Sequence, residues 1–318
     1  MTDRPLTNSN GETLPIFRPE EAAAFGILIA DVMDTYLEQK TSLAPVPIAG
    51  STLSRFWTID GTLVARDVLF KDDHTLDTDA ENTVFYGYLA HRNGSDGQQE
   101  FVAIIRGTEG LKEWLIDAKA DQERYSLDGC GEVEGGFYGV YRTMEFRPLL
   151  SPDRSGDSAW NGIVTFLKNS PRSRLVVTGH SLGAALATYL LFDLCRSGEL
   201  ENVTGCLFAS PRPGNHEFAA NFDQKVIQYD VYDYDRDIVP NLPPYFMGYV
   251  PLPRMAEINH ATAKAEIADE VRANHHVLCY SAMLDFGAVS NLDEWRALLV
   301  RDQDDPDSIL GPRRENAH

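Results

Sequence analysis

An apolar strand meets an apolar helix at Val176-Val177-Thr178-Gly179-His180-Ser181-Leu182-Gly183-Ala184-Ala185. The strand covers 175–178 and the helix begins at Leu182, which places Ser181 at a sharp turn between them. A turn this tight brings Gly179 and Gly183 close together, and we expect a side chain at either position to clash. A serine held in this way, with its oxygen pushed outward, is typical of a nucleophile on an α/β sheet.

Composition and charge exclude several classes of protein. The 318 residues include 28 basic and 48 acidic ones, a formal charge of −20, and the acids are spread along the chain. Nucleic acid and anionic lipid would both repel such a chain, so we expect no nucleic-acid partner, whereas neutral substrates are not excluded. With 43% hydrophobic residues there is ample material for a core.

No membrane-spanning or leader segment is expected. The N-terminal stretch Met1 to Phe17 is polar and lacks the apolar region of a secretory signal peptide. No apolar run approaches the roughly 18 residues that a transmembrane helix needs. The sequence therefore predicts a cytoplasmic location, or export without a cleaved signal peptide, with at most transient contact with a lipid interface.

Four cysteines, Cys130, Cys195, Cys206 and Cys279, stand far apart and form no C-x-x-C pair. Several lie in apolar stretches, and we expect free, buried thiols.

Helical and strand patterns alternate along most of the chain, which predicts a single α/β domain with a mostly parallel sheet flanked by helices. We expect this domain over 16–301, a flexible N-terminus over 1–15 and a flexible C-terminal tail over 302–318. Helices are predicted at 19–38, 137–146, 159–167, 182–196, 217–222, 274–286 and 293–300. Strands are predicted at 54–59, 62–70, 84–91, 101–106, 175–178, 204–209 and 226–232, with a turn at Asp60-Gly61.

A serine nucleophile requires a histidine base and a carboxylate that orients it, and in α/β-hydrolases both follow the serine in the chain. His180 is expected to point away from the serine, while His216 lies too soon after it and His318 is terminal. The residues alone leave His260, His275 and His276 as candidates.

Six short sequence motifs occur in the order in which the class 3 lipase family has them. The chain therefore resembles that family from about Val102 to Tyr280. That family includes fungal triacylglycerol lipases, plant phospholipases A1 and bacterial esterases. The blocks are Ile105-Arg106-Gly107-Thr108, Trp114-Leu115-Ile116-Asp117, Val133-Glu134-Gly135-Gly136-Phe137, Gly179 to Ala185, Phe208-Ala209-Ser210-Pro211-Arg212-Pro213-Gly214-Asn215 and Asp237-Ile238-Val239-Pro240-Asn241-Leu242-Pro243-Pro244.

The resemblance implies an α/β-hydrolase fold and roles for individual residues. Asp237 matches the family's acid, and His275 matches its base because His275 and Tyr280 have the H-x4-Y spacing of many members. His276 is the alternative base and His260 a weaker one. The oxyanion hole would combine the backbone N–H of Leu182 with Thr108. Glu134 departs from the family, which has a histidine there, and this affects local hydrogen bonding rather than the chemistry.

The family carries a lid after the strand that ends near Thr108. Here the segment 109–118 holds Trp114 among charged residues, which fits a lid over the substrate site as well as an ordinary core helix. A calcium site at the aspartates 230, 233, 235 and 237 is disfavoured, because the loop lacks the glycine and distant glutamate of an EF-hand.

The resemblance implies a cofactor-free serine esterase or lipase that hydrolyses carboxylic esters of lipids, acylglycerols among them, through an acyl-enzyme on Ser181. A phospholipase A1 or an acyltransferase would use the same residues. A catalytically silent binding scaffold on the same fold is the alternative from another class.

Overall fold

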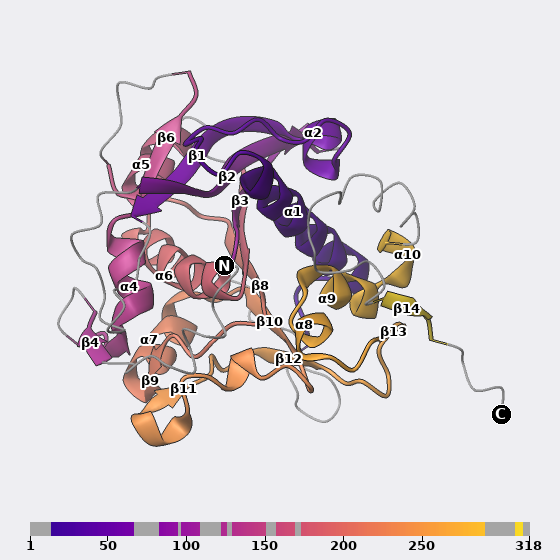
Figure 1. The fold of residues 1–318 in the computed structure, drawn as a ribbon. Coiled ribbons are helices and arrows are strands. Elements are labelled where there is room, and N and C mark those ends of the chain that lie inside the picture. Colours follow the sequence, from indigo (N-terminus) through magenta and orange to yellow (C-terminus); the bar gives the residue numbers. More distant parts are fainter. Residues whose placement is uncertain are drawn as a thin grey trace.

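The computed structural model describes residues 14–66, 83–94, 97–108, 122–125, 129–150, 157–168, 173–289 and 309–313. Their centre is an eight-stranded sheet in the order β12-β10-β8-β7-β3-β2-β1-β6 (Figure 1). In that order the strands are Met255–Ile258, Tyr229–Tyr234, Val203–Phe208, Arg174–His180, Gln99–Ile105, Thr83–Asn93, Thr58–Arg66 and Glu145–Pro148.

The sheet is mixed. Pairing is parallel from β12 to β3 and antiparallel from β3 to β6, so four of the seven pairings are parallel. Parallel strands bring their carboxyl ends to one edge, and the ends of β3, β7 and β10 therefore lie close together. The blocks that contain Arg106, Ser181 and Asp237 follow these three strands and lie at this edge.

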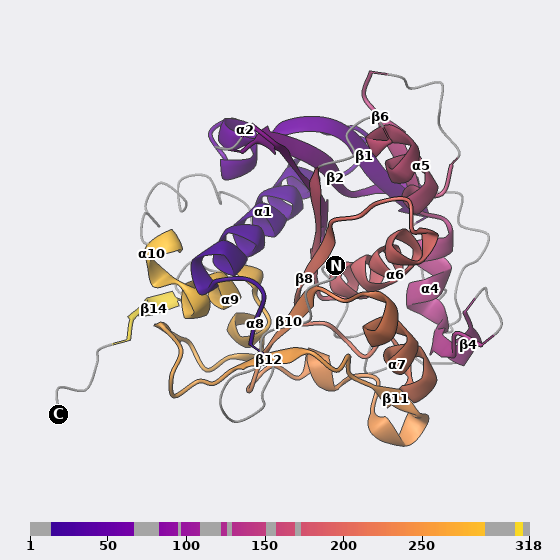
Figure 2. The ribbon, with the colours of Figure 1, turned by 180° about the vertical axis from the view of Figure 1, so that it is seen from behind.

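Helices cover both faces of the sheet, which gives the layered α/β architecture that the alternating pattern predicts (Figures 1 and 2). One face packs against α4 (Gly135–Arg142), α5 (Ala159–Leu167), α6 (Leu182–Ser197) and α7 (His216–Lys225). The other packs against α1 (Pro19–Glu38), α8 (Val271–Asn274), α9 (Val277–Leu284) and α10 (Phe286–Val289). Each face forms its own apolar cluster, and the side chains along β7 contribute alternately to the two.

Smaller elements surround this frame. A four-stranded sheet has the order β11-β9-β5-β4, formed by Tyr249–Val250, Gly214–Asn215, Glu132–Glu134 and Gln122–Arg124. Two 3-10 turns, η2 (Val239–Asn241) and η3 (Tyr245–Met247), lie in the loop that follows β10. Within the described ranges, no helix has both the length and the apolar character to cross a membrane.

Most predicted elements are confirmed, including the helices at 19–38, 159–167 and 182–196 and the strands at 84–91, 101–106, 175–178 and 204–209. The strand predicted at 54–59 is wrong at its start, where α2 (Thr52–Phe56) forms because the Ser51 hydroxyl accepts the Ser54 N–H at 3.1 Å. The turn predicted at Asp60-Gly61 is also wrong, because β1 runs through it with a bulge. The helix predicted at 137–146 ends at Arg142, and β6 follows.

The C-terminal segment also differs from expectation. Within the tail predicted to be flexible over 302–318, Ile309–Pro312 forms β14 and pairs with β13 (Ala265–Ile267). Ile309 is buried in the apolar cluster beside α9, which gives this stretch a reason to be ordered. The helix predicted at 293–300 lies outside the described residues.

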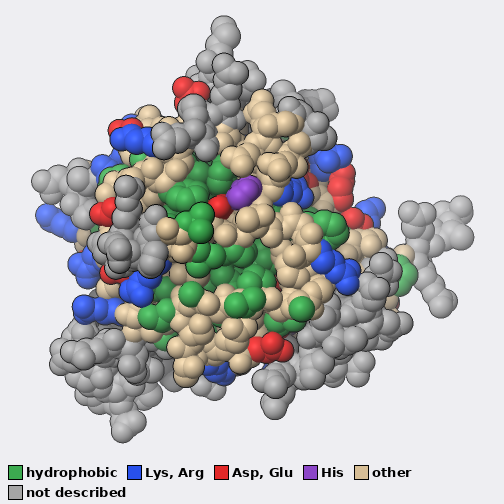
Figure 3. All heavy atoms as spheres, turned by 90° about the horizontal axis from the view of Figure 1, so that it is seen from above, with side chains coloured by type: hydrophobic (Ala, Val, Ile, Leu, Met, Phe, Trp, Pro, Cys, Tyr) green, Lys and Arg blue, Asp and Glu red, His purple; other side chains and the backbone are tan. Residues whose placement is uncertain are grey.

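All four cysteines are free, as predicted; Cys206 and Cys279 are buried, and Cys130 and Cys195 are half-buried. Burial raises the pKa of the Cys279 thiol to about 12, so this group is a neutral thiol at ordinary pH. Seen from above, hydrophobic side chains gather in the middle of the face while acidic and basic ones are interspersed around its edge (Figure 3). On this face the acidic groups are dispersed rather than gathered in one patch.

Candidate active site

Ser181 lies between the end of β7 and the start of α6 in a backbone conformation that L-residues rarely adopt. Its φ is 61° and its ψ is −128°, and its N–H donates to the carbonyl of Phe208 at 3.0 Å. Such a conformation costs on the order of 1–3 kcal/mol and persists only where the surroundings hold it. Here the strands on either side hold the turn, and the serine is fixed at the sheet edge.

The two glycines of the turn are required by close packing. A Cβ on Gly179 would lie 2.3 Å from the carbonyl oxygen of Gly183. A Cβ on Gly183 would lie 2.4 Å from the oxygen of Ile105. The expected clash is therefore confirmed, and the second contact adds that Gly183 lets α6 approach the end of β3.

Three side chains from separate elements form one hydrogen-bonded chain at this edge. The Ser181 Oγ lies 2.7 Å from Nε2 of His275, and Nδ1 of His275 lies 2.7 Å from Oδ2 of Asp237. His275 follows α8 and Asp237 follows β10, and both side chains are largely shielded from solvent. This is the arrangement in which an imidazole can take a proton from a hydroxyl while a carboxylate fixes its tautomer.

Asp237 is itself held by two further donors. The N–H of Val239 donates to its Oδ1 at 3.0 Å, and the hydroxyl of Tyr280 donates to its Oδ2 at 2.8 Å. Tyr280 is fully buried and accepts a hydrogen bond from the Tyr234 N–H at 3.0 Å. From the sequence, Tyr280 is predicted only to mark the spacing of His275, and the H-x4-Y pattern is the signal that could have revealed this contact.

The other candidate histidines lie apart from the serine. His276 caps α9, where its Nδ1 accepts the N–H of Leu278 at 3.2 Å. His260 is bonded to Asp235 at 2.6 Å. His180 makes no hydrogen bond to Ser181, but it does not point away from the site as expected, because its ring centroid lies 4.7 Å from that of His275.

The segment proposed for the oxyanion hole lies against the serine. A Cβ on Gly107 would be 3.3 Å from the Cβ of Ser181, and exposed Thr108 follows directly. Arg106 anchors this strand end, since its buried guanidinium donates to the carbonyls of Phe85 and Gly107 at 2.8 and 2.7 Å. Leu182 is the first residue of α6, and the first N–H groups of a helix have no intrahelical acceptor.

Glu134, which replaces the family's histidine, is buried and caps α4. Its Oε2 accepts the N–H of Phe137 at 2.6 Å. An acid at a helix N-terminus is favoured by the helix dipole as well as by this bond. The departure is thus accounted for by local hydrogen bonding, as expected.

The aspartates considered for calcium face different partners. Asp230 accepts the N–H groups of Ile16 and Phe17 at 2.7 and 2.9 Å, and Asp235 and Asp237 bond histidines. Burial, together with the charge of Asp237, raises the pKa of Asp233 to about 8. Within the described part of the chain, no three metal-ligating side chains come together.

The segment 109–118 with Trp114, considered as a lid, lies outside the described residues.

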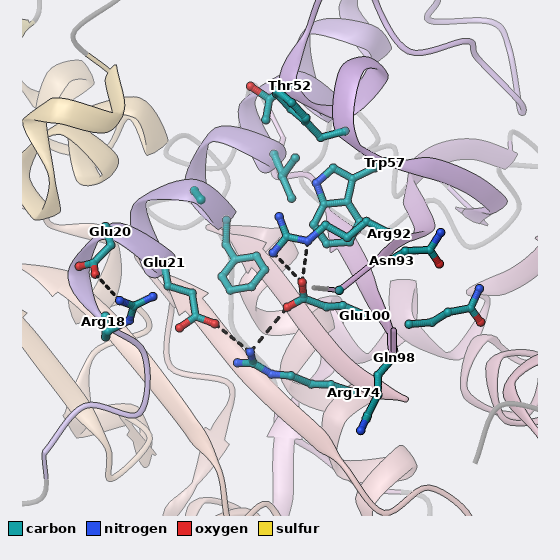
Figure 4. Close-up of a pocket in the computed structure, with 16 residues that line it drawn as sticks. Arg18, Glu20, Glu21, Thr52, Trp57, Arg92, Asn93, Gln98, Glu100 and Arg174 are labelled. Carbon is teal, nitrogen blue, oxygen red and sulfur yellow. Dashed lines mark hydrogen bonds and ion pairs between the residues drawn. The ribbon is translucent and has the colours of Figure 1, made fainter. Parts of the chain in front are cut away.

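A pocket of about 810 Å³ opens at the far ends of β3 and β7, remote from the serine (Figure 4). Its charged groups pair with one another: Arg92 with Glu100 at 2.7 Å and Arg174 with Glu21 at 2.8 Å. The Arg92 guanidinium also stacks on Trp57 at 4.5 Å. The pocket lies at the starts of β3 and β7, whereas Ser181 follows the end of β7, so the pocket is separate from the candidate active site.

The mixed sheet, the strained serine between β7 and α6 and the flanking helices define an α/β-hydrolase. In fold, the chain is similar to a mutant form of MDLA from Penicillium cyclopium, with a TM-score of 0.54 and 23% identity over 76% of this chain and 81% of that one. The class 3 lipase family model, "Lipase (class 3)", matches residues 102–247, and this segment belongs to that family.

The chain is also similar in sequence to curated proteins that are named lipase or phospholipase A1. Phospholipase A1-II 5 of Oryza sativa subsp. indica is 27% identical over 215 residues, which cover 60% of this chain and 46% of the relative. A lipase of Rhizopus niveus is 25% identical over 229 residues, which cover 68% of this chain and 55% of the relative. The chain thus spans about half the length of these curated relatives.

Proposed function

We propose that this protein is a serine esterase that hydrolyses carboxylic esters of lipids, acylglycerols in particular, through an acyl-enzyme on Ser181. The observation that carries the proposal is the hydrogen-bonded chain from Ser181 through His275 to Asp237. The names of the relatives, lipase and phospholipase A1, support lipid esters as the substrate class.

In the proposed reaction, Nε2 of His275 takes the Ser181 proton as Oγ attacks the ester carbonyl carbon. Asp237 accepts from Nδ1–H throughout, which fixes the tautomer and stabilises the imidazolium that forms. The negative charge on the carbonyl oxygen would be met by the N–H of Leu182 and by Thr108.

The tetrahedral intermediate then collapses with cleavage of the bond to the leaving oxygen, and His275 returns its proton to the alcohol. Water next enters, and His275 removes a proton from it as its oxygen attacks the acyl carbon. The second tetrahedral intermediate collapses with cleavage of the bond from the acyl carbon to Oγ, and His275 returns the proton to Oγ, which releases the acid and restores Ser181. Protons and electron pairs balance without a cofactor.

Turnover of p-nitrophenyl esters of graded acyl length tests the proposal, with Ser181→Ala as the matched variant. We expect turnover by the wild type, stoichiometric fluorophosphonate labelling of Ser181, and loss of both in the variant, whose shorter side chain fits the turn. A folded wild type that neither turns over these esters nor becomes labelled would favour a catalytically silent scaffold.

A phospholipase A1 is the second candidate, because a relative from Oryza sativa bears that name. Phosphatidylcholine with distinguishable sn-1 and sn-2 chains separates the two activities. Release of the sn-1 acid at a rate above that from a matched diacylglycerol would favour the phospholipase. Acyl transfer to an added alcohol, in preference to water, would instead indicate an acyltransferase.

A further inference from the structure

His180 occupies the space beside the base, although the mechanism above gives it no role. It directly precedes Ser181, its side chain is buried, and its ring lies against that of His275 with centroids 4.7 Å apart and an interplanar angle of 40°. Its edge also meets the ring of Tyr280, with centroids 6.1 Å apart at 70°. One ring therefore contacts both the base and the tyrosine that holds Asp237.

We propose that His180 is a positioning residue for His275, and that its buried, uncharged ring fixes the plane of the base and keeps water from one face of it. The proposal rests on the proposed function, because it assigns His275 the role of base. It explains why a polar ring is buried at a place where it makes no bond to the serine.

The surroundings favour the neutral form of His180. Burial lowers its pKa well below the usual range for histidine, and the charges of the neighbouring His275 and His276 act in the same direction, while a hydrogen bond with the His275 backbone partly opposes the shift. The third titratable neighbour, Tyr280, is a neutral phenol, since burial raises its pKa well above the usual range. Among the residues that the structure describes, Nε2 of His180 has no hydrogen-bond partner, so a charged ring would leave a buried N–H unpaired.

A neutral neighbour has a direct consequence for the base. His275 becomes an imidazolium during acyl transfer, and a second positive charge in contact with it would oppose that step. A neutral aromatic ring in the same place does not oppose formation of the imidazolium, and it limits the rotation of the His275 ring. Removing the ring would open a space that water can fill, and water beside His275 would stabilise its charged form.

The experiment compares His180→Ala with His180→Phe on a soluble short-chain ester, with concentrations set by fluorophosphonate titration of reactive serine. For His180→Ala we expect kcat to fall by about 10-fold or more, with KM within about 2-fold, because orientation of the base is lost rather than substrate binding. We also expect the acid-limb midpoint of the pH–rate profile to move to higher pH. His180→Phe, which restores an uncharged ring, should recover most of the rate and the original midpoint.

His260→Ala is the control, since His260 is an exposed histidine paired with Asp235, and its loss should leave the midpoint unchanged. If His180→Ala does not fold, His180→Gln removes the ring while keeping a polar side chain. An unchanged midpoint in the folded variant, or equal losses in His180→Phe and His180→Ala, would overturn the proposal. NMR titration of the His275 ring reports on the base without turnover, so an inactive wild type counts against the proposed function alone.

Discussion

The hydroxyl of Tyr280 donates to Oδ2 of Asp237 at 2.8 Å, and the same oxygen bonds Nδ1 of His275 at 2.7 Å. One carboxylate oxygen thus joins a buried tyrosine on α9 to the imidazole that faces Ser181. Tyr280 thus holds the acid, and His275 contacts the serine.

Tyr280→Phe should lower kcat by about 10- to 100-fold with little change in KM, because a hydrogen bond to a charged group contributes roughly 1.5–3 kcal/mol. The acid-limb midpoint should rise, since Asp237 would hold more charge opposite His275. Steady-state kinetics across pH check this. Tyr88→Phe is the matched control, because it removes a buried hydroxyl that donates to Pro45 at 2.6 Å; equal losses of activity in the two variants would contradict a role for Tyr280 in positioning.

Ser181→Gly should be more stable than Ser181→Ala by about 1–2 kcal/mol. Both lack the nucleophile, but only glycine accepts a φ of 61° without steric cost. Urea unfolding of the two inactive variants measures the difference. Equal midpoints and slopes would mean that the turn stores no strain.

His275→Ala should reduce kcat by roughly 10³-fold or more, as expected for loss of a general base. His276→Ala should retain activity and lose about 1 kcal/mol of stability, because it removes the cap of α9. Kinetics and thermal unfolding of both variants test the pair. The reverse pattern would assign the role of general base to His276 instead of His275.

Asp31 should make the protein less stable as pH rises from about 4 to 7. Burial raises the pKa of this carboxyl to about 7, although the N–H groups of Leu53 and Thr52 partly oppose the shift. The unfolded group titrates near its usual value of about 4, so the native state binds more protons in this window and stability falls with pH by roughly 1–4 kcal/mol.

Asp31→Asn can still accept the Leu53 N–H and should flatten this dependence while raising stability above pH 7. Urea unfolding at pH 5 and pH 8 provides the comparison. A variant with the same slope against pH as the wild type would assign the effect to other groups.

Turnover on vesicles should slow as their anionic fraction rises, because a chain of charge −20 approaches a negative surface against repulsion. Added salt should reduce the difference. Hydrolysis of a labelled ester in zwitterionic and anionic vesicles at low and high salt measures both effects. Faster turnover on the anionic vesicles would contradict the expectation that the net charge keeps the protein from anionic surfaces.

Local sequence determined much of the fold. The apolar spacing of 19–38 and of 182–196 predicts two helices that the structure contains, and Gly179 and Gly183 are explained by the tight turn they flank. Errors arose where one hydrogen bond outweighed the pattern. The cap from Ser51 turns the start of a predicted strand into α2.

The sequence by itself determined that Ser181 stands at a sharp turn, because the turn is built from neighbours in the chain. Without the family resemblance, the sequence limited the candidates for the base to three histidines and did not distinguish among them. Only the tertiary structure brings His275 to Ser181 while His276 turns to α9, because adjacent residues at a break between two helices point in different directions. Contacts such as those of Tyr280 with Asp237 and of His180 with His275 join distant segments, and distances of that kind are set by packing of the whole sheet rather than by local pattern.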